Sequence, residues 1–363
     1  MPRHPDKPVS NRSAGERIRC GVVGVGKMGG YHAAKYAKLK GVEFVGVVDS
    51  NPQRAEAVAE SWSCRPFTSE RELLDAGVDA VSIAVPTSAH MKSARPFLEA
   101  GVACLVEKPL APDGETAWAL KELAEQNGVC LMVGHIERFN PVVQAMEKLR
   151  GEGHEVTPRF IEVHRVSPMT FRSVDVGVVM DMMIHDIDVV LNLMGGAEPV
   201  EVQASGVAVV TEHEDICNAR LRFETEAGPC VANISASRLA FKTERLTRIT
   251  GEGGYIKIDY AAKKGTVIRR TANELQRQEV IEQLRAGADL SDLDWSELVN
   301  IEPLEIEEID QLEMEICAFL DAVRTGRRPP IDAEAGFVNV RTAERIVGAT
   351  KEFIASLEPF TTA

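Results

Sequence analysis

The stretch that decides the fold is Ile18–Gly29, which reads IRCGVVGVGKMG. Its first six residues suit a buried strand, and they lead into a GxGxxG pattern formed by Gly24, Gly26 and Gly29. Such a pattern is informative only where it follows a strand and opens a helix, and residues 28–41 have the composition of a helix that ends at a glycine. The first glycine permits a tight turn, the second lets a pyrophosphate approach the main chain, and the third lets the helix pack on the strand.

Beyond this stretch, strands and helices alternate as far as residue 135. The strand segments are continuous apolar runs, which is typical of parallel strands covered on both faces by helices. Asn51-Pro52 and Asp113 are expected to open two of the helices. We therefore predict an α/β fold, a Rossmann domain with a doubly wound parallel sheet, over residues 18–135. The further strands are expected at residues 43–49, 79–86, 103–109 and 129–135.

The pattern changes near residue 136. A helix over residues 136–150 is followed by a long apolar helix over 178–194 and several runs with strand character. This predicts an α+β domain over residues 136–330 with a mostly antiparallel sheet. Residues 262–308 are charged and without periodicity, which favours a solvated surface.

Length, charge and cysteine usage narrow the class of protein. The 363 residues suit two domains, and the net charge of −14 argues against a nucleic-acid or anionic-membrane partner. Seven scattered cysteines without a CxxC pair indicate reduced thiols and a cytoplasmic location. Residues 1–17 are polar and read as a flexible tail without the apolar core of a signal peptide, and no run is long and apolar enough to span a membrane.

Asp49 points to the cofactor. It ends the second strand twenty positions after Gly29, where a carboxylate accepts hydrogen bonds from the adenosine ribose and repels a 2′-phosphate. No arginine follows it directly, since Arg54 lies more than a helical turn away, so we expect NAD rather than NADP. Further cofactor contacts are expected at the start of the helix that follows the glycine-rich turn and at the end of the strand at 79–86. Thr87 or Ser88 could equally cap the helix that follows this strand. These further contacts are Lys27, Met28, Pro86, Thr87 and His90.

Glu107-Lys108-Pro109 ends another buried strand. A lysine directly at the carboxyl end of such a strand would stand over the cofactor, where its charge can stabilise a developing alkoxide. Glu107 could hold Lys108 by a charged hydrogen bond and is itself expected near the cofactor. The alternative is an exposed lysine at a strand end.

The apolar helix over residues 178–194 carries a polar stripe. Asp181, His185, Asp188 and Asn192 are spaced four, three and four residues apart and share one face of an α-helix. His185 can accept the proton that leaves a hydroxyl, and Asp181 can orient it or bind a substrate hydroxyl. A buried histidine paired with aspartate is the structural alternative. A metal site is not expected, because no further ligands are evident.

With GVGKMG, Asp49, Glu107-Lys108-Pro109 and Asp181-x-x-x-His185 in this order, the chain resembles the Gfo/Idh/MocA oxidoreductase family over about residues 18–358. The resemblance implies that Lys108 and His185 are catalytic. It also implies an open sheet that mediates a homo-oligomer, dimer or tetramer, and a closing helix over 331–358 that packs back on the Rossmann domain.

Within the family, Gly134–Val143 and the segment before His185 are similar to the branch that contains UDP-N-acetylglucosamine 3-dehydrogenases, which oxidise the 3-hydroxyl of a nucleotide sugar. Many members carry three glycines before the aspartate, whereas this chain has Val176-Gly177-Val178. Arginines suit a diphosphate, although each could instead serve an ion pair. The implied substrate contacts are Arg138, Asn140, Arg165, Arg172 and His185.

Three other interpretations stay open at this point. The chain could act on inositol or a free sugar, without needing arginines for a diphosphate. It could be a non-catalytic NAD-binding redox regulator, although such a protein would need neither Lys108 nor His185. The same residues would also serve reduction of a keto sugar as well as oxidation of a hydroxyl.

Overall fold

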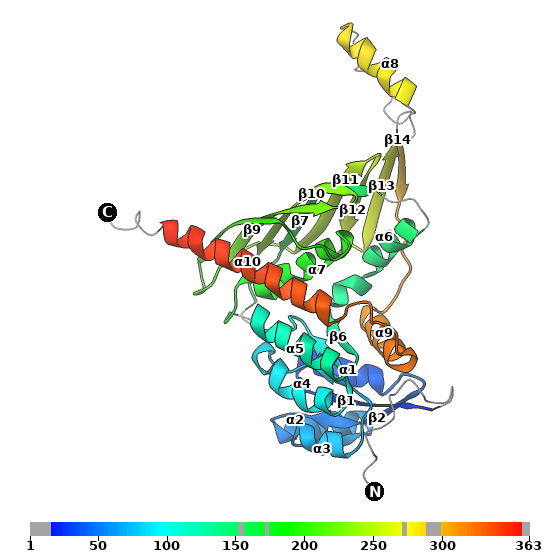
Figure 1. The fold of residues 1–363 in the computed structure, drawn as a ribbon, viewed down its shortest axis with the longest axis vertical. Coiled ribbons are helices and arrows are strands. Elements are labelled where there is room, and N and C mark those ends of the chain that lie inside the picture. Colours follow the sequence, from blue (N-terminus) through cyan, green and yellow to red (C-terminus); the bar gives the residue numbers. More distant parts are fainter. Residues whose placement is uncertain (1–15, 152–155, 171–173, 271–273, 288–298, 358–363) are drawn as a thin grey trace. The chain divides into compact units, whose positions relative to one another are not determined.

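We describe a computed structural model of the chain over residues 16–151, 156–170, 174–270, 274–287 and 299–357 (Figure 1). These residues form two compact units. The first comprises residues up to 139 together with 309–344, and the second comprises residues 140–308 together with the remainder from 345. None of the helices in the described ranges is long and apolar enough to cross a membrane.

The first unit is built on a six-stranded parallel sheet in the order β3-β2-β1-β4-β5-β6. Successive strands are added on one side of β1 up to β3 and on its other side from β4 onward, and ligands of such sheets bind beyond the carboxyl ends of the strands at this switch point. The predicted Rossmann sheet is therefore confirmed. Its strands are β1 (Ile18–Val23), β2 (Val42–Val48), β3 (Arg65–Phe67), β4 (Ala80–Ile83), β5 (Ala103–Glu107) and β6 (Leu131–Gly134).

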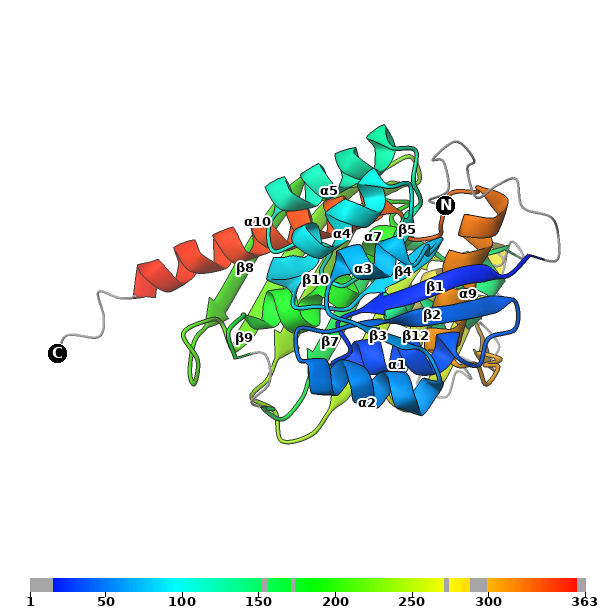
Figure 2. The same cartoon turned by 90° about the horizontal axis from the view of Figure 1, so that it is seen from below.

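Helices cover both faces of this sheet, with α1 and α2 on one side and α3, α4 and α5 on the other (Figure 2). Two predicted helix starts are confirmed, because the Asn51 and Asp113 side chains accept hydrogen bonds from the main-chain N–H groups of Arg54 and Thr116. The helices are α1 (Lys27–Tyr36), α2 (Pro52–Trp62), α3 (Glu70–Asp75), α4 (His90–Glu99) and α5 (Gly114–Gln126), with short turns η2 (Thr87–Ala89) and η3 (Ile136–Phe139).

A later segment completes the first unit. Helix α9 (Gln311–Thr325), which the sequence pattern placed in the second domain, packs against α1 and η3. Most of its apolar residues are buried, and Lys35 on α1 forms ion pairs with Asp310 and Glu313 at the start of α9. The difference arises because amphipathicity shows that a helix buries one face but not which partner covers it.

The second unit holds an eight-stranded sheet in the order β14-β13-β12-β11-β7-β10-β9-β8. Of the described pairings, only β10 with β7 is parallel, so the predicted, mostly antiparallel sheet is confirmed. Along β9 and β10 buried and more accessible residues alternate, as expected for one covered face. The strands are β7 (Thr157–Val166), β8 (Glu201–Val207), β9 (Ile216–Thr225), β10 (Gly228–Ser237), β11 (Glu244–Glu252), β12 (Gly254–Asp259), β13 (Lys264–Arg270) and β14 (Val299–Pro303).

We predicted residues 262–308 to be irregular, but their described part contains regular structure, whereas the acidic run at the end of this stretch is largely accessible, as predicted. The described part contains β13 and β14, which pair with each other and extend the sheet. Helix α7 packs on β7 and β10, and α10 contributes residues up to 344 to the first unit and later ones to the second. The helices are α6 (Pro141–Gly151), a π-helical turn η4 (Val179–Met183), α7 (Ile184–Leu193), α8 (Glu274–Arg285) and α10 (Ala333–Leu357).

Candidate functional site

The turn between β1 and α1 forms an open cradle of main-chain N–H groups. Gly24 has φ of +81°, and a Cβ there would lie 2.8 Å from the carbonyl oxygen of Ala84. A Cβ at Gly29 would lie 1.7 Å from the carbonyl oxygen of Gly24, so both positions require glycine. Nothing lies within 4 Å of the Cβ position at Gly26, and no side chain caps the helix there. The uncapped helix start fits the pyrophosphate of a dinucleotide, with exposed Lys27 and half-buried Met28 on its first turn.

Asp49 is fixed beside this cradle. Its Oδ2 accepts a hydrogen bond from the N–H of Val25 at 2.9 Å, and its Oδ1 accepts one from Asn51 at 2.8 Å. Arg54, which looked distant in the sequence, also reaches the carboxylate, but only at 3.4–3.5 Å and with half of its side chain exposed. Contacts this long are weak, so ribose hydroxyls could replace the guanidinium on Asp49.

Replacing Asp49 with serine is expected to shift cofactor use from NAD towards NADP. The variant loses a charged acceptor for the ribose, which should lower kcat/KM with NAD about 10- to 100-fold. It also releases Arg54 to bind a 2′-phosphate, so kcat/KM with NADP should rise. Steady-state rates with both nucleotides check this, and the double variant Asp49→Ser/Arg54→Ala should lose the gain with NADP. A single variant that kept its preference for NAD would contradict the assignment.

The end of β4 holds three predicted cofactor residues. Pro86 is exposed and Thr87 half-buried, and neither Thr87 nor Ser88 caps α4, because no side chain bonds to the start of that helix. His90 is 1% exposed, and its ring nitrogens lie 3.2 Å from the carbonyl of Leu110 and 3.1 Å from that of Val85. Burial lowers the pKa of His90 although both carbonyls favour its protonation. His90 therefore ties together the loops that follow β4 and β5.

Glu107 and Lys108 lie at the carboxyl end of β5, with Glu107 buried and Lys108 half-buried. The Glu107 carboxylate accepts a hydrogen bond from the main-chain N–H of Lys108 at 3.3 Å, and the Lys108-Pro109 peptide bond is cis. The other oxygen of the Glu107 carboxylate lies 2.9 Å from Nε2 of His32, a residue that the sequence analysis missed. Burial raises the pKa of Glu107, but the bond from His32 and the charges of His32 and Lys108 more than offset it, so the net pKa is lowered.

The segment with Asp181 and His185 departs from the single α-helix that we predicted. Residues 179–183 form a π-helical turn, and α7 begins only at Ile184. Because a π turn bonds residues five apart, Asp181 does not follow the α-helical stripe. Asp181 and His185 are half-buried, whereas Asp188 is 1% exposed. Such turns inside helices are frequent at functional sites, and this one places both predicted residues at the start of the helix.

A glutamate from another loop holds the start of this helix. Glu214 is 6% exposed. Its main-chain carbonyl accepts a hydrogen bond from the N–H of Val178, and its side-chain carboxylate accepts one from the N–H of Val179. A Cβ at Gly177 would lie 1.9 Å from Oε1 of Glu214, so the one glycine kept in this loop leaves room for the carboxylate. Arg238 donates to the carbonyl of Val176 at 2.7 Å. The loop is thus fixed by residues far away in the sequence.

The residues expected to bind substrate have different surroundings. Arg165 is 4% exposed and donates hydrogen bonds to Asp186 from Nε at 2.6 Å and from Nη2 at 2.9 Å. Its fork therefore faces a protein carboxylate, and this ion pair holds the residue next to His185. Asn140 is buried and accepts a hydrogen bond from the N–H of Val142 at the start of α6. Arg138 is half-buried in η3, and Arg172 lies outside the described residues.

Both halves of the chain match one family of known proteins. Residues 18–135 match the oxidoreductase family with an NAD-binding Rossmann fold, and residues 153–257 match the GFO/IDH/MocA C-terminal domain. The UDP-N-acetylglucosamine 3-dehydrogenase of Acidithiobacillus ferrooxidans is 36% identical over 343 residues, which cover 94% of this chain and 98% of that enzyme. The chain belongs to the Gfo/Idh/MocA oxidoreductase family. It is an NAD-dependent sugar dehydrogenase of that family.

Solved structures and further relatives agree with the assignment of this chain to the Gfo/Idh/MocA family. A structure of the Acidithiobacillus enzyme has a TM-score of 0.80 at 37% identity and covers 93% of this chain and 98% of its own. The inositol 2-dehydrogenase of Rhizobium meliloti is 28% identical over 66% of this chain and 74% of that enzyme. A levoglucosan dehydrogenase, solved with NADH and levoglucosan, shares the fold at 19% identity, with a TM-score of 0.77 over 93% of this chain and 98% of that one.

Proposed function

We propose that the protein oxidises the 3-hydroxyl of UDP-N-acetylglucosamine to a ketone, a step towards amino sugars of lipid A or surface glycans. The similarity to the Acidithiobacillus enzyme over nearly the whole of both chains carries this proposal. The inositol dehydrogenase match is lower in identity and covers less of this chain. Nucleotide-sugar oxidation therefore has better support than oxidation of inositol or a free sugar.

The proposed reaction uses two side chains. The His185 imidazole takes the proton of the sugar hydroxyl, and the Lys108 ammonium stabilises the negative charge that develops on the oxygen. NAD, when bound, supplies the acceptor for the hydride that leaves the carbon. Asp181 orients the histidine or binds a neighbouring hydroxyl. The reverse reaction would use the same groups, with His185 returning the proton.

The arginines do not share one proposed role. Arg165 supports His185 through its ion pair with Asp186 rather than binding the diphosphate, because its donors already face that carboxylate. Arg138 and Arg172 remain proposed contacts of the diphosphate, and Asn140 supports the start of α6. Substituting Arg165 would consequently disturb catalysis with any substrate and does not distinguish a nucleotide sugar from inositol.

A single-turnover experiment tests the proposal. Equimolar protein, NAD and UDP-N-acetylglucosamine are mixed, and reduced nicotinamide is followed by absorbance, so that product that stays bound is also detected. We expect a rise with the wild-type protein, and Lys108→Ala and His185→Ala should each slow it strongly. No rise, with NAD binding shown separately, would discard the nucleotide sugar. Myo-inositol and free N-acetylglucosamine then serve as the panel for the second candidate function.

We also propose a homo-oligomer in the cytoplasm. One face of the eight-stranded sheet presents accessible polar residues such as Asn218, Arg220 and Asn233, which suit a hydrated interface between copies. All seven cysteines are free, in keeping with a reducing compartment. Light scattering coupled to gel filtration tests the assembly, and a monomer at micromolar concentration would contradict it.

A further inference from the structure

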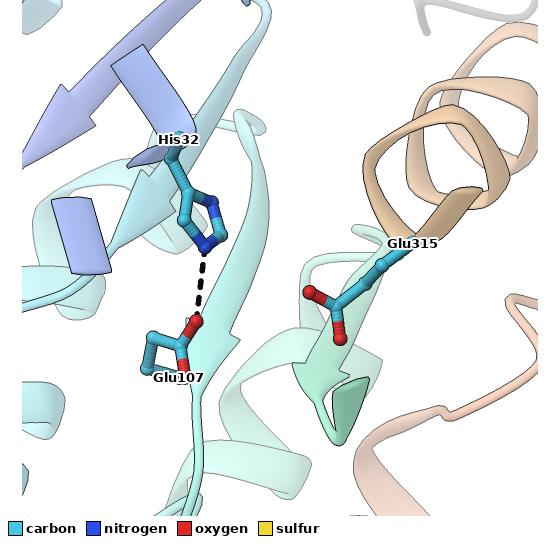
Figure 3. A group of neighbouring side chains, drawn as sticks. All are labelled: His32, Glu107 and Glu315. Atoms are coloured by element: carbon cyan, nitrogen blue, oxygen red, sulfur yellow. Dashed lines mark hydrogen bonds and ion pairs between the residues drawn. The ribbon is translucent and has the colours of Figure 1, made fainter. Parts of the chain in front are cut away.

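A chain of buried hydrogen bonds ends at the Glu107-Lys108 pair. The Tyr36 hydroxyl lies 2.8 Å from Oγ of Ser82, which lies 3.0 Å from Nδ1 of His32. Nε2 of His32 lies 2.9 Å from Oε1 of Glu107, as Figure 3 shows. The first three side chains are at most 1% exposed and Glu107 is 9% exposed. Four residues from α1, β4 and β5 thus form one polar network inside the first unit.

The Glu107 carboxylate fixes the direction of the first of these bonds, and the charge of His32 sets the direction of the others. A Glu107 carboxylate can only accept, so Nε2 of His32 carries the proton that it donates. In a neutral imidazole Nδ1 is then an acceptor, which receives the Ser82 hydroxyl proton, and Ser82 in turn accepts the proton of Tyr36. Every proton in the network has an acceptor in this arrangement. A cationic His32 would instead donate from Nδ1 to Ser82 and reverse the remaining bonds.

We propose that His32 is a positioning residue, which acts through Glu107 to hold Lys108 in place for the reaction. The carboxylate that His32 orients also receives the main-chain N–H of Lys108, so one rigid group fixes the residue that bears the ammonium. A buried hydrogen bond to a charged group is strong. Residues that support a catalytic side chain in this way determine how closely that side chain is held to its productive position. The role of Lys108 rests on the proposed function, whereas the network itself does not.

Other titratable side chains lie near the pair. Glu315 of α9 is fully buried, and its carboxylate, His32 and Glu107 have oxygen or nitrogen atoms within 4.8 Å of one another (Figure 3). The positive charge of Lys108 and the buried ring of His90 also face Glu107. Three such groups could in principle hold a metal ion, but an ion would have to replace the bond between His32 and Glu107. The metal content of the purified protein therefore distinguishes a metal site from the hydrogen bond between His32 and Glu107.

Two neutral amide variants, which differ in length by one methylene group, test the proposal. In His32→Gln the amide nitrogen can take the place of Nε2 and donate to Glu107, whereas in His32→Asn the shorter amide reaches only towards Ser82. We expect His32→Asn to lower the single-turnover rate of hydride transfer about 10- to 100-fold, because a bond to a charged group is lost. His32→Gln should recover the rate to within about threefold. NAD affinity should be unchanged in both variants.

A readout without turnover tests the network in the same proteins. In protein labelled with ¹⁵N-histidine, we expect the His32 ring to show an Nε2–H proton that exchanges slowly with solvent, because the ring is buried and Glu107 accepts that proton. This signal should vanish in both His32 variants and shift in Glu107→Gln. If the Nε2 proton of His32 exchanges freely, if both variants lose activity equally, or if a stoichiometric metal ion is present, the proposal is overturned. A wild-type protein that keeps the signal but does not oxidise the sugar would instead reject the proposed function.

Discussion

Replacing His185 with alanine is expected to lower the rate of hydride transfer about 10²- to 10⁴-fold, with NAD affinity unchanged. The imidazole is the proposed acceptor of the hydroxyl proton, and loss of a general base costs rates of this order. His185 is not among the residues that we expect to contact the nucleotide, so NAD affinity should be retained. Single-turnover absorbance gives the rate, and fluorescence titration with NAD gives the affinity.

His164 offers a matched control for this prediction. It lies on β7 in the same unit, with nearly half of its side chain exposed and a partner, Glu244, at 3.6 Å. His164→Ala should therefore retain the wild-type rate. A His185→Ala protein with an unchanged rate would remove His185 from the mechanism. An equal loss of rate in both variants would indicate that replacing either histidine disturbs the fold of this unit.

Arg165→Ala should destabilise the protein by about 3–5 kcal/mol, the usual effect of removing one partner from a buried ion pair. The Arg165 and Asp186 side chains are 5% and 2% exposed, so alanine would leave the Asp186 carboxylate buried without its strongest donor. We expect catalysis to fall as well, because Asp186 adjoins His185 in α7. Urea unfolding followed by circular dichroism measures the change.

Two further variants sharpen this test. Arg222→Ala removes a surface arginine that pairs with Glu201 and Glu224, and it should change stability far less. Replacing both buried partners, as Arg165→Met/Asp186→Leu, should recover most of the stability, since no charge is left buried. If Arg165→Ala were as mild as Arg222→Ala, the pair would contribute little and Arg165 would again be a candidate for binding the diphosphate.

Several features of the fold were predictable from neighbouring residues alone. The strand before Gly24 and the helix starts at Asn51 and Asp113 agree with the structure because each depends on contacts within a few positions. The π turn at residues 179–183 was missed, because an α-helical stripe and a π turn differ by one residue in spacing. β13 and β14 were missed because their charged residues hide the alternation.

The sequence by itself determined the class of chemistry. A glycine-rich turn after a strand and an acidic strand end predict a dinucleotide site from residue types and spacing, and Lys108 and His185 are the side chains that we propose for the chemistry. The surroundings of these residues were decided only in the tertiary structure. His32 meets Glu107 across 75 positions, and Arg165 meets Asp186 across 21. Spacing along the chain reports neighbours on one helix or strand, whereas a buried charge takes its partner from whichever element packs against it.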